Sequence, residues 1–232
     1  MKLERLERIE KVRAQVHIPR TVDTARARLL TESYKETEGE PMPIRRGKAL
    51  KKILSEMPIY IHDGQLLVGN QGERSRAGLI YPEFQWGTIL NEMSTWQTRP
   101  GDKFIITEKQ QEELRELLVY WKGKTVKDRA WAIMPEKIKT SLNMGVISNA
   151  NYLMSGHGHF VTNFEKVLNK GFIGIQQEIQ EKISSLIPTD SAYYEKITYY
   201  QGLLETIEAV KIYAERYSCL ARTCLLYTSR CV

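Results

Sequence analysis

Apolar residues at helical spacing are the feature of this 232-residue sequence that most constrains its fold. They recur every three or four positions in several windows, which places side chains along one face of an α-helix. Prolines, glycines and capping patterns separate these windows. We therefore predict a mainly α-helical chain with one or a few short strands. Long helices are expected from Leu3 to a stop before Pro19 and over 21–38, 44–57, 107–121, 164–186 and 192–220, with short helices after Thr125 and near Pro135.

One short apolar segment departs from the helical pattern. The run Gln65 to Gly69, QLLVG, is apolar and flanked by glycines, so we predict a buried strand. The following run, NQGERSRAGLIYPE, is rich in glycine and charge and is expected to be a loop, extended at Tyr81 because Pro82 follows. A lone strand needs a partner. We therefore expect the rest of its sheet to lie in sequence that is not here, so that the chain is a fragment.

Two capping boxes mark helix starts in the second quarter of the chain. Thr107 and Gln110 have the spacing at which a hydroxyl and an amide satisfy backbone donors of the first turn, and Thr125 and Asp128 repeat it. Gly123 is expected to end the helix between them.

Composition excludes several classes of protein. The net charge of +6 is spread along the chain without a Lys/Arg block, so a nucleic-acid partner is not expected. No stretch approaches the roughly 20 apolar residues of a membrane-spanning helix, and the N-terminus is charged throughout, so we predict no membrane association and a cytoplasmic protein. All three cysteines, Cys219, Cys224 and Cys231, lie in the last 14 residues, which leaves no disulfide framework for the rest.

The most reactive segment is the loop Gly156-His157-Gly158-His159-Phe160. If it is extended, alternation places both imidazoles on one side, an arrangement that would suit a metal pair. No carboxylate is adjacent, so we predict no metal site. The competing interpretation from the residues alone is a histidine that is hydrogen-bonded for structure.

Three blocks carry a resemblance to a known family. RTVDTARARLLTESYKETEGEPMPIRRGKALKKIL, QLLVGNQGERSRAGLIYPEF and NYLMSGHGHFVTNFEKVLNKGF follow one another in the order and spacing of the N-terminal part of pyruvate formate-lyase-like glycyl radical enzymes. Within that family the chain most resembles the glycerol and propanediol dehydratase branch. The resemblance covers residues 5–222, an incomplete pyruvate formate-lyase domain. The segment CLLYTSRCV resembles a translated sequencing adapter, so 223–232 is expected to be a non-native tail.

The resemblance implies that this chain is the N-terminal portion of a ten-stranded α/β barrel. Such enzymes abstract a hydrogen atom from substrate with a cysteine thiyl radical, which is generated from a glycyl radical installed by a separate radical S-adenosylmethionine activase. No directly bound cofactor is implied. The expected partners are that activase and a small hydroxylated substrate, and a homodimer is expected for the full-length enzyme. The chain contains neither the Gly-Cys-x-Glu block nor the Arg-Val-x-Gly-Tyr block. As written it is therefore expected to be inactive.

Two residues match substrate-facing positions of the dehydratase branch. The histidine of the Gly-x-Gly-His pattern, which hydrogen-bonds a substrate hydroxyl, is His159, and the substrate-facing asparagine eight residues earlier is Asn151. His157 and Asn163 depart from the glycerol dehydratases, which have an apolar residue and an aspartate there. These departures leave open another diol, a hydroxylated amino acid, isethionate or an unassigned compound as substrate.

Arg45, Arg46, Tyr81 and Glu83 fall in family blocks, and we expect them to be structural. Two other functions stay open. One is formate C-acetyltransferase (pyruvate formate-lyase) activity in the full-length protein, and the other is a non-catalytic helical interaction protein.

Overall fold

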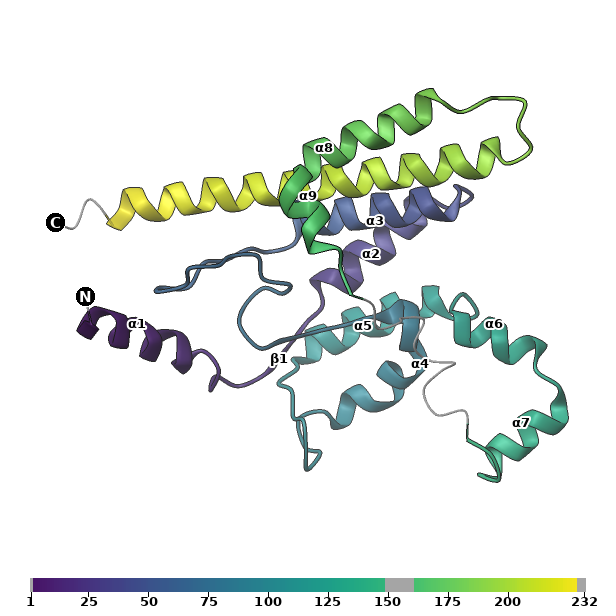
Figure 1. Ribbon diagram of the computed structural model, residues 1–232. Coiled ribbons are helices and arrows are strands. Elements are labelled where there is room, and N and C mark those ends of the chain that lie inside the picture. The colour runs from purple at the N-terminus through teal and green to yellow at the C-terminus, as the bar shows by residue number, and fades with distance from the viewer. Residues whose placement is uncertain (1, 149–160, 229–232) are drawn as a thin grey trace. The chain divides into compact units, whose positions relative to one another are not determined.

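The computed structural model describes the backbone of residues 2–148 and 161–228 (Figure 1). The described part of the chain is mainly helical with two short strands, as the sequence predicts. Its elements are α1 (Lys2–Ala14), β1 (Thr21–Asp23), α2 (Ala25–Glu36), α3 (Met42–Glu56), β2 (Ala77–Leu79), α4 (Pro82–Glu92), the 3-10 turn η1 (Met93–Thr95), α5 (Glu108–Trp121), α6 (Val126–Ile133), α7 (Glu136–Asn143), α8 (Phe164–Ser184) and α9 (Tyr193–Thr228). Within these ranges no helix combines the length and apolar character needed to cross a membrane.

The chain forms two compact units. Unit 1 comprises Met1–Pro19, Arg28–Ala77 and Thr162–Val232, and unit 2 comprises Arg20–Ala27 and Gly78–Val161. Each unit therefore combines segments that are distant in sequence.

Unit 1 is organised by the packing of α3 along α9. A Cβ atom built on Gly47 of α3 would lie 2.5 Å from the carbonyl oxygen of Gly202 on α9, and one built on Gly202 would overlap the carbonyl of Pro43. Only glycine permits the two backbones to approach so closely. At the end of α3, the Arg216 guanidinium donates to the carbonyl oxygens of Leu54 (2.5 Å) and Met57 (2.6 Å), which lie where a helix leaves its acceptors unsatisfied.

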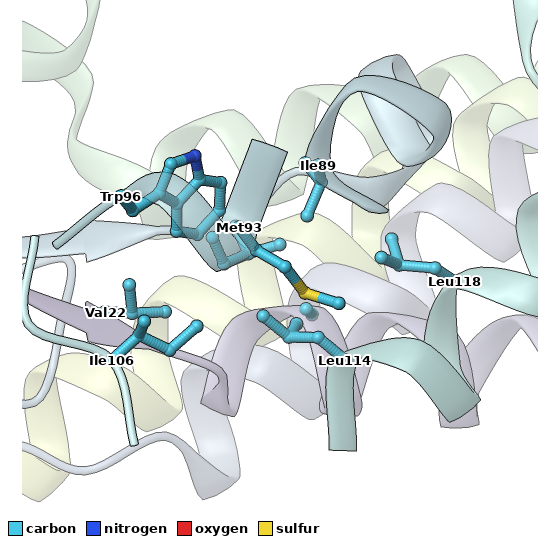
Figure 2. Packing of buried hydrophobic residues seen from close by; sticks show 9 residues of the cluster. Val22, Ile89, Met93, Trp96, Ile106, Leu114 and Leu118 are labelled. Carbon is cyan, nitrogen blue, oxygen red and sulfur yellow. The ribbon is translucent and has the colours of Figure 1, made fainter. Parts of the chain in front are cut away.

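Unit 2 is built around a small sheet and a cluster of buried apolar side chains. β1 pairs with β2 and, through Thr21, forms a parallel bridge to Ile105. The cluster consists of Val22, Ala27, Ile80, Ile89, Met93, Trp96, Ile106, Leu114 and Leu118. Figure 2 shows Met93 extending toward Leu114 of α5. The cluster therefore joins β1 to α4 and α5.

Both capping boxes are confirmed. The Gln110 backbone N–H donates to the Thr107 hydroxyl oxygen (3.2 Å), and the Thr107 N–H donates to the Gln110 side-chain oxygen (2.9 Å). The reciprocal pair at Thr125 and Asp128 is also present. Gly123, just after α5, has the positive φ of 76° that a glycine at a helix end allows.

The predicted strand at 65–69 is wrong. This segment has no regular secondary structure, and Leu66 and Leu67 are 75% and 86% exposed. A buried strand needs a backbone partner and a surface to cover its apolar side chains, and the described residues supply neither at this position. The second strand is instead β2, inside the stretch predicted to be a loop.

Two helix boundaries also differ from the prediction. Thr21 does not cap α2, because the β-branched pair Thr21 and Val22 belongs to β1; the Asp23 carboxylate instead accepts from the Ala25 N–H at 2.8 Å. At the other end of the chain, α9 extends to Thr228, beyond the expected stop at Leu220. The assignment of 223–232 as a non-native tail stays a prediction.

The close contact between α3 and α9 predicts that Gly202→Ala destabilises the chain. A glycine-to-alanine change in an open helix position normally stabilises by up to about 1 kcal/mol. At Gly202 the added methyl group meets the Pro43 carbonyl, so a loss of about 1–3 kcal/mol is expected from urea unfolding. Gly87→Ala in α4 is the control, because nothing lies within 4 Å of a Cβ atom there. Equal unfolding free energies for the two variants would contradict this account.

Candidate functional site

The predicted substrate-binding residues, His159 and Asn151, lie outside the described residues, and so does His157. The structure therefore does not test their roles. It does describe the chain on the C-terminal side of this segment, where α8 begins.

Asn163 is the N-cap of α8. Its side-chain oxygen accepts from the Lys166 backbone N–H at 2.9 Å. Asparagine and aspartate cap helices about equally well, so the departure from aspartate noted in the sequence preserves this local structure. Asn163 follows His159 by four positions in the chain.

A cluster around Arg26 fixes the Tyr-Pro-Glu turn that begins α4 in unit 2. The Arg26 guanidinium contacts both carboxylate oxygens of Glu83, at 2.5 and 3.2 Å, and donates to the Ile80 carbonyl oxygen at 3.2 Å. Its Cζ atom lies 4.0 Å from the centroid of the Tyr81 ring. Both charged side chains are only 18% exposed, so this bidentate pair is shielded from solvent. Tyr81 and Glu83 therefore have a structural role, as expected: both contact Arg26 at the start of α4.

Arg45 is also engaged in structural contacts. Its guanidinium donates to the Tyr34 carbonyl oxygen at 2.7 Å and lies 4.6 Å from the Tyr34 ring centroid. This cation therefore satisfies the end of α2. The sequence alone indicates neither Tyr34 as its partner nor Arg26 as the partner of Glu83.

A cavity with a volume of about 550 Å³ lies in unit 2. Apolar side chains such as Val22, Ile89 and Phe104 dominate its lining, and Arg99 and Glu92 lie at its polar part. The Arg99 and Glu92 side chains are 4.0 Å apart. Such a lining suits apolar contact and carries no nucleophile paired with a base.

The described residues contain no cluster of side chains that would bind a metal ion. Among these residues no group of three or more His, Cys, Asp or Glu side chains could hold a metal ion. Cys219 is an exposed free cysteine on α9.

Asp128 joins the start of α6 to α4. Its carboxylate accepts from the Thr125 hydroxyl (2.8 Å), the Trp86 indole N–H (2.9 Å) and the Gly123 N–H (3.0 Å). Burial works against ionisation of this carboxyl group, but the hydrogen bonds outweigh it, so that the pKa of Asp128 lies below its usual value. The negative charge is therefore part of the folded structure of unit 2.

Comparison with known proteins gives the family. Residues 1–226 match the family described as pyruvate formate lyase-like. The chain is 32% identical over 210 residues to Probable dehydratase YbiW of Escherichia coli (strain K12), covering 90% of this chain and 26% of that protein. The chain therefore belongs to the pyruvate formate lyase-like family.

Solved structures agree with this assignment. The glycerol-bound B12-independent glycerol dehydratase from Clostridium butyricum is 36% identical with a TM-score of 0.85, covering 91% of this chain and 27% of that one. A glycyl radical enzyme from Archaeoglobus fulgidus is 34% identical with a TM-score of 0.86, covering 93% and 28%. The chain thus spans about a quarter of the length of these relatives and has the fold of a portion of them, as the resemblance implies.

Loss of the α8 cap predicts local unfolding next to the histidine segment. Asn163→Ala should destabilise the first turn of α8 by about 1 kcal/mol, whereas Asn163→Asp should preserve it. Amide hydrogen exchange at Lys166 measures this directly. Equal exchange in the two variants would show that the cap does not stabilise the turn.

The lowered pKa of Asp128 predicts an acid-sensitive unit 2. Because the pKa of Asp128 in the folded protein lies below the ordinary value of an aspartate, the stabilisation by its carboxylate is fully present above that ordinary value and is lost as pH falls through the folded-state pKa. Thermal unfolding at a series of pH values from 7 to 2 should show a lower Tm for Asp128→Asn at pH 7 and a smaller further loss in acid. Trp86→Phe removes one donor and should give an intermediate pH dependence; an unchanged pH profile in Asp128→Asn would contradict the assignment.

Proposed function

We propose that this chain is the N-terminal part of a glycyl radical dehydratase or lyase, which eliminates water or another leaving group from a small hydroxylated substrate. The observation that carries the proposal is the match of nine-tenths of the chain to a quarter of a glycerol dehydratase, at a TM-score of 0.85. Relatives named as dehydratases, together with the Gly-x-Gly-His pattern, favour elimination over formate C-acetyltransferase activity.

His159 and Asn151 are proposed to bind the substrate. Elimination of water from a diol radical requires one hydroxyl group to lose a proton and the other to leave protonated. An imidazole exchanges protons near neutral pH, so His159 suits contact with a hydroxyl group, and the amide of Asn151 can both donate and accept a hydrogen bond. The choice among diols, hydroxylated amino acids and isethionate follows from residues outside this chain as well as from these two.

The radical machinery is proposed to belong to the rest of the full-length protein. Neither the Gly-Cys-x-Glu block nor the Arg-Val-x-Gly-Tyr block occurs in this sequence, so the 232-residue chain alone should not turn over substrate. A radical S-adenosylmethionine activase would install the glycyl radical, and we expect the full-length enzyme to be a cytoplasmic homodimer.

The match to about a quarter of each relative favours a piece of a larger enzyme over a stand-alone interaction protein, and the exposed apolar side chains agree with it. Leu67, Ile133 and Leu168 are each more than 80% exposed and lie on three separate segments. Large apolar side chains at several exposed positions are typical of surfaces that pack against further protein.

The test is His159→Ala in the full-length enzyme after anaerobic incubation with its activase. The glycyl radical signal in electron paramagnetic resonance should be unchanged, because His159 is proposed to contact substrate and not the radical. Product formation should fall by about 10²–10⁴-fold. His17→Ala, at an exposed position just after α1, is the matched control and should retain activity. Full turnover by the His159 variant would contradict the substrate-binding role.

A further inference from the structure

A second cavity, of about 430 Å³, lies in unit 1 between the C-terminal end of α1 and the segment 60–77. Its polar lining includes two guanidinium groups, an imidazole, a hydroxyl and two carboxamides, contributed by Arg74, Arg76, His62, Ser75, Asn70 and Gln71. No Asp or Glu occurs among the described residues that line it. The cavity thus combines positive charge with hydrogen-bond donors.

The hydroxyl and imidazole groups of this cavity are held in one arrangement. The Ser75 Oγ atom lies 2.8 Å from His62 Nε2, and the Tyr60 side chain is also hydrogen-bonded to Ser75. The Tyr60 and His62 rings are 4.5 Å apart between centroids. Tyr60, His62 and Ser75 therefore hold one another in place at the wall of the cavity.

Asn70 ties the same segment to α9. Its backbone N–H donates to the Tyr217 hydroxyl oxygen at 3.0 Å, its carbonyl oxygen accepts from the Tyr213 hydroxyl, and its side chain donates to the Tyr60 carbonyl oxygen at 3.3 Å. Tyr217 is buried. The loop is therefore anchored on a long helix, which pre-organises the cavity for a ligand.

Arg76 occupies a strained backbone conformation at the cavity. Its φ of 59° is in the left-handed region, which strains the backbone of any residue other than glycine. The conformation is held by a hydrogen bond from its guanidinium to the Val16 carbonyl oxygen, at the end of α1. A guanidinium group has five N–H donors, so this bond leaves others for a ligand in the cavity.

We propose that this cavity binds a small oxyanion such as a phosphate group. Guanidinium groups match tetrahedral and planar oxyanions through paired N–H donors, and the carboxamides of Asn70 and Gln71 can complete the set. The site does not depend on the radical chemistry proposed above, because its residues all lie in this chain and outside the His159 segment.

The experiment is a titration of inorganic phosphate with the full-length protein at constant ionic strength, in which binding is measured as broadening of the ³¹P resonance. The wild-type chain should give a saturable response. Arg74→Gln and Arg76→Gln should each weaken binding by about tenfold, since each removes a charged hydrogen-bond donor, and Arg76→Lys should retain part of it. Arg115→Gln on α5 of unit 2 is the matched control and should bind as the wild type does.

A third variant separates binding from folding. Arg76→Gly removes the side chain together with its hydrogen bond to Val16, but glycine adopts the positive φ without strain, so the circular dichroism spectrum should match the wild type while phosphate binding is lost. The proposal is overturned if the wild-type chain gives no saturable response, or if Arg76→Gly and Arg74→Gln bind phosphate as tightly as Arg115→Gln.

Discussion

A chain made almost wholly of helices is stable only where the apolar face of each helix is covered. The described structure has both covered and uncovered helix faces. Leu114 and Leu118 of α5 are completely buried in the cluster of unit 2, whereas Leu168 of α8 is 82% exposed. The covered faces supply the stability of each unit. The uncovered faces are those expected of a chain that spans about a quarter of the length of its relatives.

Local signals in the sequence predicted local structure well. The two capping boxes depend on residues three positions apart, so Thr107 and Thr125 identify their helix starts without reference to the rest of the fold. The strand predicted at 65–69 failed because a short apolar run is buried only if a distant partner covers it. β1 was missed for the same reason, since Thr21 forms its bridge with Ile105.

In the candidate site too, local contacts could be predicted from the sequence, whereas contacts between residues far apart in the chain could not. His159 and Asn151 came from family resemblance, and no spacing rule distinguishes such residues from hydrogen-bonded structural ones. The Arg26–Glu83 pair joins residues 57 positions apart, and Tyr217 reaches Asn70 across 147 positions. Contacts of this kind follow from tertiary packing, which periodicity does not encode. Asn163 is intermediate, because its capping role could be predicted from its place before an apolar helical run.

The central claim is that this chain is the N-terminal part of a glycyl radical enzyme, and a long-read sequence of the native locus beyond the codon for Arg222 tests it most directly. The account predicts that the reading frame continues through a Gly-Cys-x-Glu block to a C-terminal Arg-Val-x-Gly-Tyr block. A stop codon directly after Val232 would contradict it, because a protein of that length has no position for the thiyl and glycyl radicals.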